Sequence, residues 1–360
     1  MSRATTMSEM KIANRIISAQ TEALIIAELS ANHNGSIDMA IETIRAAKRA
    51  GADCIKLQTY TADTLTIDSD RPDFLIKGTI WEGKKLHQLY QEAYTPWEWH
   101  AKLFKVAQEE GLICFSSPFD QTAVDFLETL EVPAYKIASF EITDIPLIEY
   151  VASKGKPMIL STGIATAQDI EWALDACRKM GNDNIALLKC TSSYPAPIEE
   201  ANLVMIQDLA MRYQVISGLS DHTLGATAPI VAVCMGAKII EKHFILDRAI
   251  GGPDASFSMD EQEFTEMVRA IRAAEKSIGT VDYTLTEKQT KGKDFSRSLY
   301  VVEDVAAGAV FTHQNVRSIR PGFGLHPKFL PEILGKRAKN DLKKGDRFQM
   351  EMVQETADYG

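Results

Sequence analysis

Short apolar runs alternate with amphipathic stretches from residue 24 onward, and this alternation occurs eight times in succession. The apolar runs have the length and composition of buried strands and cover 24–29, 53–58, 111–116, 134–139, 156–161, 185–190, 214–220 and 237–243. The clearest stretches with helical periodicity are 36–52, 120–130, 166–181 and 260–279. Eight such strand–helix units predict a closed (β/α)8 barrel, with a doubly wound open sheet as the alternative.

Residues at the ends of the helical stretches support these assignments. Asp120, Thr166 and Asp260 each precede a stretch and can cap its N-terminus by accepting hydrogen bonds from backbone amides. Gly181 and Gly279 follow two of the stretches, where glycine commonly ends a helix.

Polar side chains follow the apolar runs, and their distribution favours the barrel over the open sheet. Functional residues of a barrel lie at the C-terminal ends of many strands, whereas an open sheet gathers them near one switch point. Here they follow different runs: Glu28, Lys56, Ser117, Ser139 with Glu141, Ser161, Ser192, His222 and His243. We therefore expect all of them at one mouth of a barrel.

The chain is expected to contain two domains. Residues 24–279 form the barrel, and residues 1–23 precede it as an N-terminal extension. Residues 280–294 are polar and predict a linker. Residues 295–360 carry short β signals and turns, which predict a small β-rich domain. The core of such a small domain would be marginal, so we expect it to pack against a larger structure.

The segment 60–95 is too long for a minimal connection between a strand and a helix, and it is rich in aromatic and charged residues. We interpret it as a functional insertion over the barrel mouth. The alternative is a surface loop without a role in binding.

Composition excludes several classes of function. A net charge of −10 argues against general binding to nucleic acid or to a membrane surface, so an anionic substrate must meet a local group of Lys and Arg. No segment approaches the ~20 apolar residues of a membrane span, and the first residues lack the apolar core of a signal peptide. The five cysteines are scattered, as expected for reduced thiols in a cytoplasmic protein.

Two histidines end consecutive strands of the predicted barrel. Because adjacent strand ends lie within several ångströms of each other, His222 and His243 could bind one divalent metal ion. A single histidine at such a position is more often a structural residue that makes hydrogen bonds than a metal ligand.

Lysines and hydroxyls at other strand ends predict an anion pocket. Lys56 and Lys136 end apolar runs, where an ammonium is costly unless it meets an anion. The hydroxyls of Ser139, Ser161 and Ser220 suit a phosphate or a carboxylate. The carboxylates of Glu28 and Glu141 could accept a proton or orient a hydroxyl or a water, or could simply pair with a lysine.

Ten motifs in fixed order resemble those of the sialic acid synthase family. They are AELSANHNG (27–35), IKLQT (55–59), SSPFD (116–120), AYKIASFE (134–141), LSTG (160–163), CTSSYP (190–195), GLSDHT (218–223), EKHF (241–244), GGPD (251–254) and IRPGFG (319–324). The resemblance implies a (β/α)8 barrel followed by a small antifreeze-like (SAF) domain. It also implies an enzyme that condenses phosphoenolpyruvate with the aldehyde form of an N-acetylated sugar.

The resemblance also implies roles for individual residues. His222 and His243 would bind manganese, for which magnesium or cobalt may substitute, and would act in catalysis together with Glu28 and Glu141. Phosphoenolpyruvate would be held by Lys56, Ser117, Lys136, Ser139, Ser161, Ser192, Ser220 and Arg320, although Ser192 replaces an asparagine of some members. Tyr194, Asp254 and Phe295 would contact the sugar. Arg320 would come from the partner subunit of a domain-swapped homodimer.

The loop 78–99 and the segment 320–328 resemble the branch of the family that makes pseudaminic acid, and Ser30 stands where sialic acid synthases usually have glycine. The resemblance then implies 2,4-diacetamido-2,4,6-trideoxy-L-altrose as the acceptor and a product used in flagellin glycosylation.

Three alternatives remain open. An N-acetylneuraminic or legionaminic acid synthase would keep the metal and donor residues and differ within 60–100. Another aldolase-type barrel might form a Schiff base at Lys56 or Lys136, which borohydride trapping would reveal. A non-catalytic sugar-binding protein would not need lysine, serine and histidine at so many strand ends.

Overall fold

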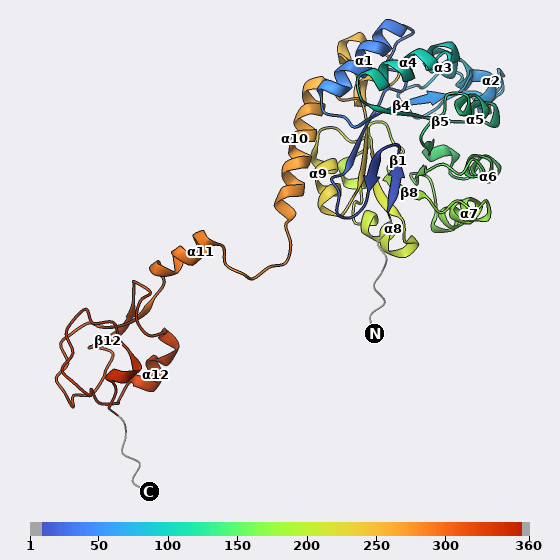
Figure 1. The fold of residues 1–360 in the computed structure, drawn as a ribbon. Coiled ribbons are helices and arrows are strands. Elements are labelled where there is room, and N and C mark those ends of the chain that lie inside the picture. The colour runs from blue at the N-terminus through green and yellow to red at the C-terminus, as the bar shows by residue number, and fades with distance from the viewer. Residues whose placement is uncertain (1–8, 355–360) are drawn as a thin grey trace. The chain divides into compact units, whose positions relative to one another are not determined.

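The structure is a computed structural model that describes residues 9–354. Residues 1–8 of the predicted N-terminal extension and 355–360 of the predicted C-terminal domain lie outside the described residues. The chain divides into two compact units, Met1–Gly279 and Thr280–Gly360 (Figure 1).

Eight parallel strands close into a barrel in the first unit, so the predicted barrel is confirmed. The strands are β3 (Leu24–Glu28), β4 (Cys54–Thr59), β5 (Ile113–Pro118), β6 (Tyr135–Ile137), β7 (Met158–Ser161), β8 (Ile185–Cys190), β9 (Ile216–Asp221) and β10 (Ile239–His243). The last strand closes the ring by pairing with the first, with His243 opposite Glu28. Each strand lies within a predicted apolar run or overlaps most of one.

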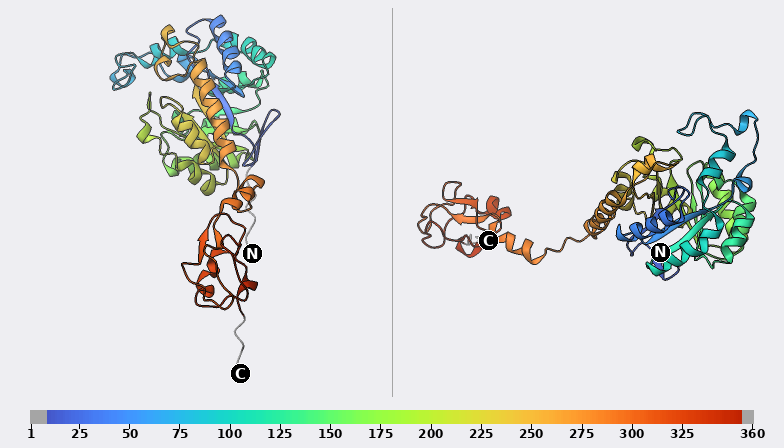
Figure 2. Two further views of the ribbon diagram at one scale, coloured as in Figure 1. Left: turned by 90° about the vertical axis from the view of Figure 1, so that its left-hand side faces the viewer. Right: turned by 90° about the horizontal axis from the view of Figure 1, so that it is seen from above.

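Helices surround the barrel, as the views of this unit in Figure 2 show. They are α1 (Ile37–Arg49), α2 (Ala62–Leu65), α3 (Leu86–Ala93), α4 (Trp97–Glu109), α5 (Gln121–Glu128), α6 (Ile145–Ala152), α7 (Ala167–Lys179), α8 (Met205–Tyr213), α9 (Thr227–Cys234) and α10 (Glu261–Ile278). Asp120, Thr166 and Asp260 cap α5, α7 and α10 through their side chains, as predicted. No helix within residues 9–354 combines the length and apolarity needed to cross a bilayer.

The interior of the barrel is apolar at its N-terminal end. Side chains alternate between the two faces of each strand, and the inward set there includes Leu24, Phe115 and Ile239, all fully buried. A hairpin of β1 (Met10–Ile12) and β2 (Arg15–Ile17) packs its apolar side chains into this same cluster. Apolar packing therefore leaves the opposite end of the barrel for polar side chains.

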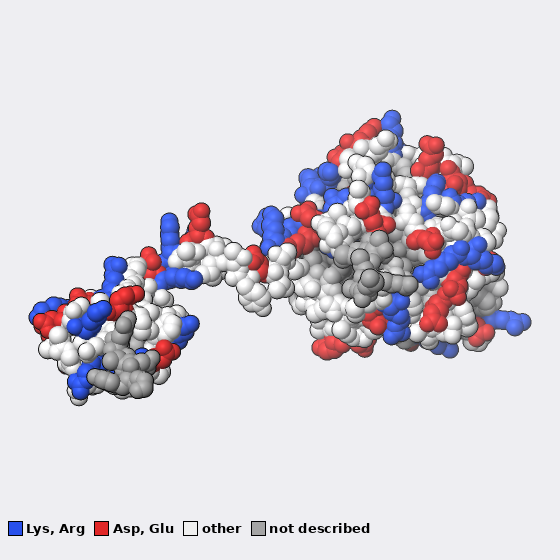
Figure 3. All heavy atoms as spheres, turned by 60° about the horizontal axis from the view of Figure 1, so that its bottom comes forward, with Lys and Arg blue, Asp and Glu red and all other residues white. Residues whose placement is uncertain are grey.

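Short helices and 3₁₀ turns lie in the loops that follow the C-terminal ends of the strands. The insertion predicted at 60–95 contains α2, the 3₁₀ helix η1 (Pro72–Phe74) and α3. Further 3₁₀ turns are η2 (Ser139–Glu141), η3 (Ile198–Glu200), η4 (Arg248–Ile250) and η5 (Ala255–Phe257). On the face drawn in Figure 3, acidic and basic side chains of the barrel unit are interspersed.

The second unit has its own core. Its elements are α11 (Glu287–Gly292), η6 (Lys293–Phe295), β11 (Ser298–Val301), β12 (Val316–Ile319), η7 (Pro327–Phe329), α12 (Leu330–Ile333) and η8 (Met350–Met352). Leu299, Phe311 and Phe348 lie at the centre of one apolar cluster. A Cβ added to Gly324 would lie 2.2 Å from the Leu299 carbonyl oxygen, so only glycine fits at this close approach of two backbone segments. The turn after Arg320 is thus packed tightly onto the domain.

Candidate active site

Two lysines and two glutamates form a buried ion-pair cluster inside the barrel. Lys56 Nζ lies 2.8 Å from Glu28 Oε2 and 2.9 Å from Glu241 Oε1, and Lys136 Nζ lies 3.1 Å from the same Glu241 oxygen. All four side chains are buried. They come from four different strands, because inward positions of neighbouring strands form layers across a barrel.

Glu241 is the centre of this cluster, and sequence reasoning missed it. Its Oε1 also accepts a hydrogen bond of 3.0 Å from Ser220 Oγ. Burial raises the pKa of Glu241, but Lys136 and Lys56 outweigh burial and hold this pKa well below its usual range. Burial lowers the pKa of Lys56 to about 7, against the attraction of Glu241. The lysines are thus held in place by carboxylates and lie where an incoming anion would meet them.

Hydroxyls extend the polar layer. Ser139 Oγ and Ser192 Oγ are 2.6 Å apart, and a Cβ at Gly163 would come within 2.5 Å of both. Ser117 Oγ and Ser161 Oγ are buried and have no hydrogen-bond partner within residues 9–354. Because a buried hydroxyl without a partner is costly, these two groups are suited to bind a ligand.

The two predicted histidines lie side by side at the barrel mouth, with ring centroids 5.3 Å apart. His222 Nδ1 lies 3.1 Å from the Thr191 carbonyl oxygen, so this nitrogen carries the proton and Nε2 is free. Burial, with a smaller effect of His243, lowers the pKa of His222 to about 3. A neutral imidazole whose second nitrogen donates to a carbonyl is the usual form of a metal ligand.

Few protein groups at the mouth are placed to bind a divalent metal ion. His243 Nδ1 is buried without a hydrogen bond, 3.6 Å from Asp254 Oδ2. Within the described part of the chain, no group of three or more His, Cys, Asp and Glu side chains is arranged to bind a metal ion. The residues therefore suit an ion with two imidazole ligands and several positions left for substrate or water.

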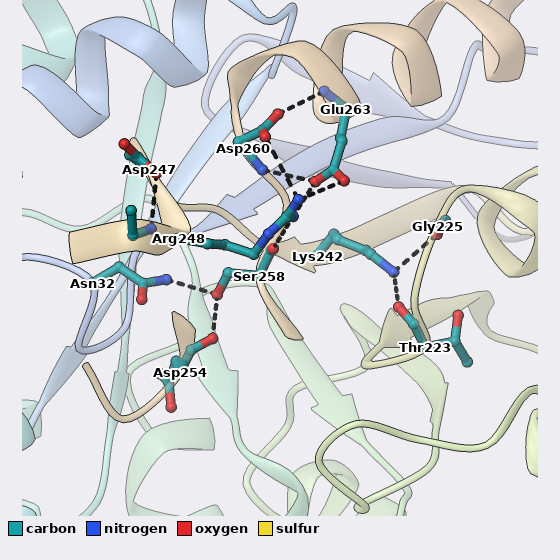
Figure 4. Close-up of polar contacts among 11 residues, drawn as sticks. Asn32, Thr223, Gly225, Lys242, Asp247, Arg248, Asp254, Ser258, Asp260 and Glu263 are labelled. Carbon is teal, nitrogen blue, oxygen red and sulfur yellow. Dashed lines mark hydrogen bonds and ion pairs between the residues drawn. The ribbon is translucent and has the colours of Figure 1, made fainter. Parts of the chain in front are cut away.

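A buried lysine supports the loop that carries His222. Lys242 Nζ donates a hydrogen bond to Asp221 Oδ2. It also donates to the carbonyl oxygens of Thr223 and Gly225 (Figure 4). These three acceptors use all three protons of the ammonium. The lysine thereby fixes the backbone on both sides of His222.

A second network supports Asp254. Asn32 Nδ2 donates to Ser258 Oγ at 2.9 Å, and Ser258 Oγ donates to the Asp254 carbonyl oxygen at 2.7 Å (Figure 4). Ser30 lines the pocket beside Asp254 with a φ of +47°, a left-handed conformation that glycine adopts more easily than serine.

A pocket of about 250 Å³ opens beside the histidines. Its polar wall contains Gln58, Ser139, Glu141, His243 and Asp254, and its apolar wall comes mainly from the insertion through Tyr60, Leu65, Trp81, Leu89 and Tyr90. Tyr194 also lines it, with its ring 4.4 Å from that of His222. The pocket joins a polar wall on the side of the histidines to an aromatic wall, which is the usual lining of a small-molecule site.

Glu28 and Glu141 differ in their surroundings. Glu28 pairs with Lys56 and also accepts a hydrogen bond of 3.2 Å from Gln58 Nε2. Burial raises the pKa of Glu141 to about 7, and its Oε2 has no hydrogen-bond partner within residues 9–354. Glu141 is therefore the carboxyl group better suited to exchange a proton near neutral pH.

Two predicted site residues belong to the second unit. Within the described chain, the exposed Arg320 makes no hydrogen bond or ion pair, and Phe295 is 73% exposed. The other predicted residues all lie in the barrel unit. Lys56 and Lys136 lie within β4 and β6 rather than at their ends as predicted, because these strands continue past the lysines, and the remaining residues lie at or near the C-terminal ends of strands or in the loops that follow them.

Comparisons with known proteins agree with the two-unit division. The NeuB family matches residues 43–283, and the SAF domain matches residues 296–354. The pseudaminic acid synthase of Campylobacter jejuni subsp. jejuni serotype O:2 is 49% identical over 337 residues, which cover 94% of this chain and 98% of that protein. The pseudaminic acid synthase of Helicobacter pylori is 48% identical over 320 residues, 89% of this chain and 94% of that protein.

A solved structure shows the same fold at lower identity. The N-acetylneuraminic acid (sialic acid) synthetase of Leptospira borgpetersenii serovar Hardjo-bovis, in complex with citrate, superposes with a TM-score of 0.71. It is 30% identical in sequence, and the alignment covers 79% of this chain and 95% of that one.

Proposed function

The chain belongs to the NeuB family, and from this we propose that it condenses phosphoenolpyruvate with the aldehyde form of 2,4-diacetamido-2,4,6-trideoxy-L-altrose. Water is consumed, and the products are pseudaminic acid and phosphate. The observation that carries the proposal is the paired arrangement of a buried lysine layer and an aromatic-walled pocket on either side of two histidines. Relatives at 48–49% identity named for this reaction support the choice of acceptor.

The donor would bind in the polar layer. Lys56 and Lys136 offer positive charge, and Ser139, Ser161 and Ser220 offer hydroxyls to its phosphate and carboxylate. Ser117 and Ser192 lie in the same layer of the mouth. Glu28 and Glu241 hold the two lysines in position before the donor arrives. Orientation of this kind lowers the entropic part of the barrier.

We expect Lys136→Met to raise the apparent KM for phosphoenolpyruvate about 10- to 150-fold, because a hydrogen bond to a charged group contributes about 1.5–3 kcal/mol. Steady-state kinetics with saturating acceptor measure this. Lys238→Met is the matched control, since Lys238 is half-buried at the opposite end of β10 and donates to the Thr21 carbonyl oxygen. Equal KM values for the parent and Lys136→Met would place the donor elsewhere.

His222 and His243 would hold the divalent cation, which we propose is manganese, with magnesium or cobalt as substitutes. The bound ion would supply Lewis-acid polarisation of the acceptor's aldehyde. Asp254 and Tyr194 adjoin the histidines and would orient the sugar.

Glu141 would take the proton released when water adds. In the proposed reaction, C3 of phosphoenolpyruvate forms a bond to the aldehyde carbon, and positive charge develops at C2. Water adds at C2 and gives one proton to Glu141, whose pKa of about 7 suits passing this proton to the alkoxide formed from the aldehyde oxygen. The second proton of the water leaves with the phosphate. The tetrahedral intermediate then loses phosphate by cleavage of its C2–O bond, which leaves a nine-carbon 2-keto acid. Glu28 would keep Lys56 in place.

We further propose that Arg320, and with it Phe295, completes the site of a partner subunit in a domain-swapped homodimer. A trianionic donor meets only two lysines in the barrel, and both already face carboxylates. The guanidinium of Arg320 is exposed and has no partner among residues 9–354, follows a strand end, and suits a carboxylate or phosphate. A cytoplasmic location and a role in flagellin glycosylation would follow from the family resemblance.

Mixing two inactive chains tests the dimer. His222→Ala and Arg320→Ala chains, allowed to exchange subunits, should regain about a quarter of the parent activity, because half of the dimers are mixed and each mixed dimer has one intact site. The measurement is turnover before and after exchange, which is followed by mass spectrometry of differently tagged chains. Proven exchange without recovery would show that Arg320 does not act across subunits.

A product assay tests the proposed function. The parent enzyme is incubated with phosphoenolpyruvate, manganese and each of three acceptors: the altrose derivative, the legionaminic acid precursor and N-acetylmannosamine. We expect efficient turnover of the altrose derivative alone. Efficient turnover of N-acetylmannosamine or of the legionaminic precursor, with none of the altrose derivative, would assign the chain to that branch instead.

A further inference from the structure

Trp81 joins the insertion to the catalytic face of the barrel. Its indole Nε1–H donates a hydrogen bond of 3.1 Å to the carbonyl oxygen of Pro253, and its ring lies 5.7 Å from that of Tyr194. Pro253 directly precedes Asp254, which faces His243. The tip of the insertion thus contacts the segment that borders the proposed metal site.

Among the described residues, this hydrogen bond is the single one that joins the tip of the insertion, residues 76–83, to the rest of the barrel. Every other hydrogen bond of residues 76–83 in the described chain stays inside the insertion, as in the bonds between Ile76 and Gly83 and between Thr79 and Glu82. The ion pairs Lys84–Glu92 and Lys85–Asp70 also stay inside it and are exposed. Exposed ion pairs contribute little to stability. The side chain of Trp81, through its N–H and its ring contact with Tyr194, therefore docks the tip on the barrel.

The indole forms a wall between the acceptor pocket and two outer cavities. One outer cavity, of about 690 Å³, is lined by Asn34, Glu82 and Gly252, and the other, of about 520 Å³, by Gly78, Phe140 and Ser193. Trp81 lines both of them as well as the acceptor pocket. Displacement of this side chain would connect the acceptor pocket to the outer cavities.

The backbone around Trp81 suits a movable tip. Gly78 and Gly83 stand on either side of it with φ values of +69° and +87°. A Cβ added to either glycine would meet nothing within 4 Å, so packing does not lock this part of the loop. Hinges of closing loops are commonly such positions.

We propose that Trp81 is a specificity-determining residue that latches the 66–85 loop over the acceptor. The latch opens to admit the sugar and, once closed, covers its apolar substituents with the indole ring. The proposal rests on the proposed acceptor pocket, in which the C6 methyl and acetamido methyl groups of the altrose derivative would meet the aromatic wall. N-acetylmannosamine carries hydroxyls at C4 and C6, which the carbon face of the indole ring cannot pair by hydrogen bonds.

Kinetics of two variants test the latch. Trp81→Ala should raise the acceptor KM at least about 30-fold, as truncation of a central aromatic contact does, and should reduce the preference for the altrose derivative over N-acetylmannosamine. Trp81→Phe keeps a ring but loses the N–H donor, so its acceptor KM should rise about 2- to 10-fold. The KM for phosphoenolpyruvate should stay within about twofold in both variants.

Trp172→Ala is the matched control, because Trp172 is 55% exposed on α7 and outside the pocket. It should change neither KM. If the parent uses a different hexosamine and ignores the altrose derivative, the proposed acceptor is wrong, and the variants are compared on the sugar that the parent uses. The latch itself is overturned if Trp81→Ala leaves the acceptor KM unchanged, or if both KM values rise together.

Discussion

His222→Ala and His243→Ala should each lower turnover at least about a thousandfold and lose the bound cation, because Lewis-acid catalysis contributes several kcal/mol to lowering the barrier. Each histidine ends a strand and projects a neutral or unpaired ring nitrogen into the mouth. Metal content after dialysis against manganese, measured by atomic absorption, gives a readout independent of activity. Chelator should abolish parental activity, and manganese should restore it.

His100→Ala is the matched control for these variants. His100 is fully buried and its Nε2 lies 2.9 Å from Thr59 Oγ1, but it does not line the pocket. We expect it to keep the metal even if the variant is less stable. Full activity of metal-free parent, or full metal content in His222→Ala, would contradict the role of the two histidines.

Glu141→Gln should lower turnover about 10²- to 10⁴-fold, the usual contribution of general acid–base catalysis. Burial raises the pKa of Glu141 to about 7. A base acts in its ionised form, so ionisation of Glu141 should raise kcat/KM of the parent as pH rises through about 7, while loss of the proton from Lys56, whose pKa is also about 7, opposes this rise by weakening donor binding. The variant should lack this rise, which a pH profile between 5.5 and about 9 would reveal.

Glu128→Gln provides the control for Glu141, since Glu128 is partly buried but lies outside the pocket, where it accepts a hydrogen bond from Tyr135. This control should keep the rise near pH 7. A fall of the parental kcat/KM through pH 7 that disappears in Glu141→Gln would mean that Glu141 acts in its protonated form, whereas a fall that persists in the variant belongs to Lys56. A rise that persists in Glu141→Gln would assign it to another group.

The barrel could be predicted because its strands are buried on both faces and therefore appear as continuous apolar runs. Helix starts were equally visible, since Asp120, Thr166 and Asp260 cap them through local hydrogen bonds. The β1–β2 hairpin was missed because its strands have three residues each and owe their burial to distant contacts with the barrel base. Helix α11 lies in the segment predicted as a linker, although Thr286 and Gln289 form a capping box that could have been recognised.

A site residue could be predicted from the sequence where the alternation of side chains along a strand alone determines that its side chain points into the barrel. Lys56, Lys136 and His243 lie in strands and point inward, as the period of two requires. Glu241 was missed, although it stands two residues before His243 and so must share its inward face. Trp81 could not be found this way, because its place over the pocket depends on the path of an irregular loop and on a hydrogen bond to Pro253, 172 residues away.

The most direct test of the account follows one carbon atom. Phosphoenolpyruvate labelled with ¹³C at C3 is incubated with the altrose derivative, the enzyme and manganese, and the products are examined by NMR while phosphate release is counted. The account predicts that the label appears in the C3 methylene of a nine-carbon 2-keto acid, with one phosphate released for each product formed. A label found only in the methyl group of pyruvate, with phosphate released and no new carbon–carbon bond, would contradict it.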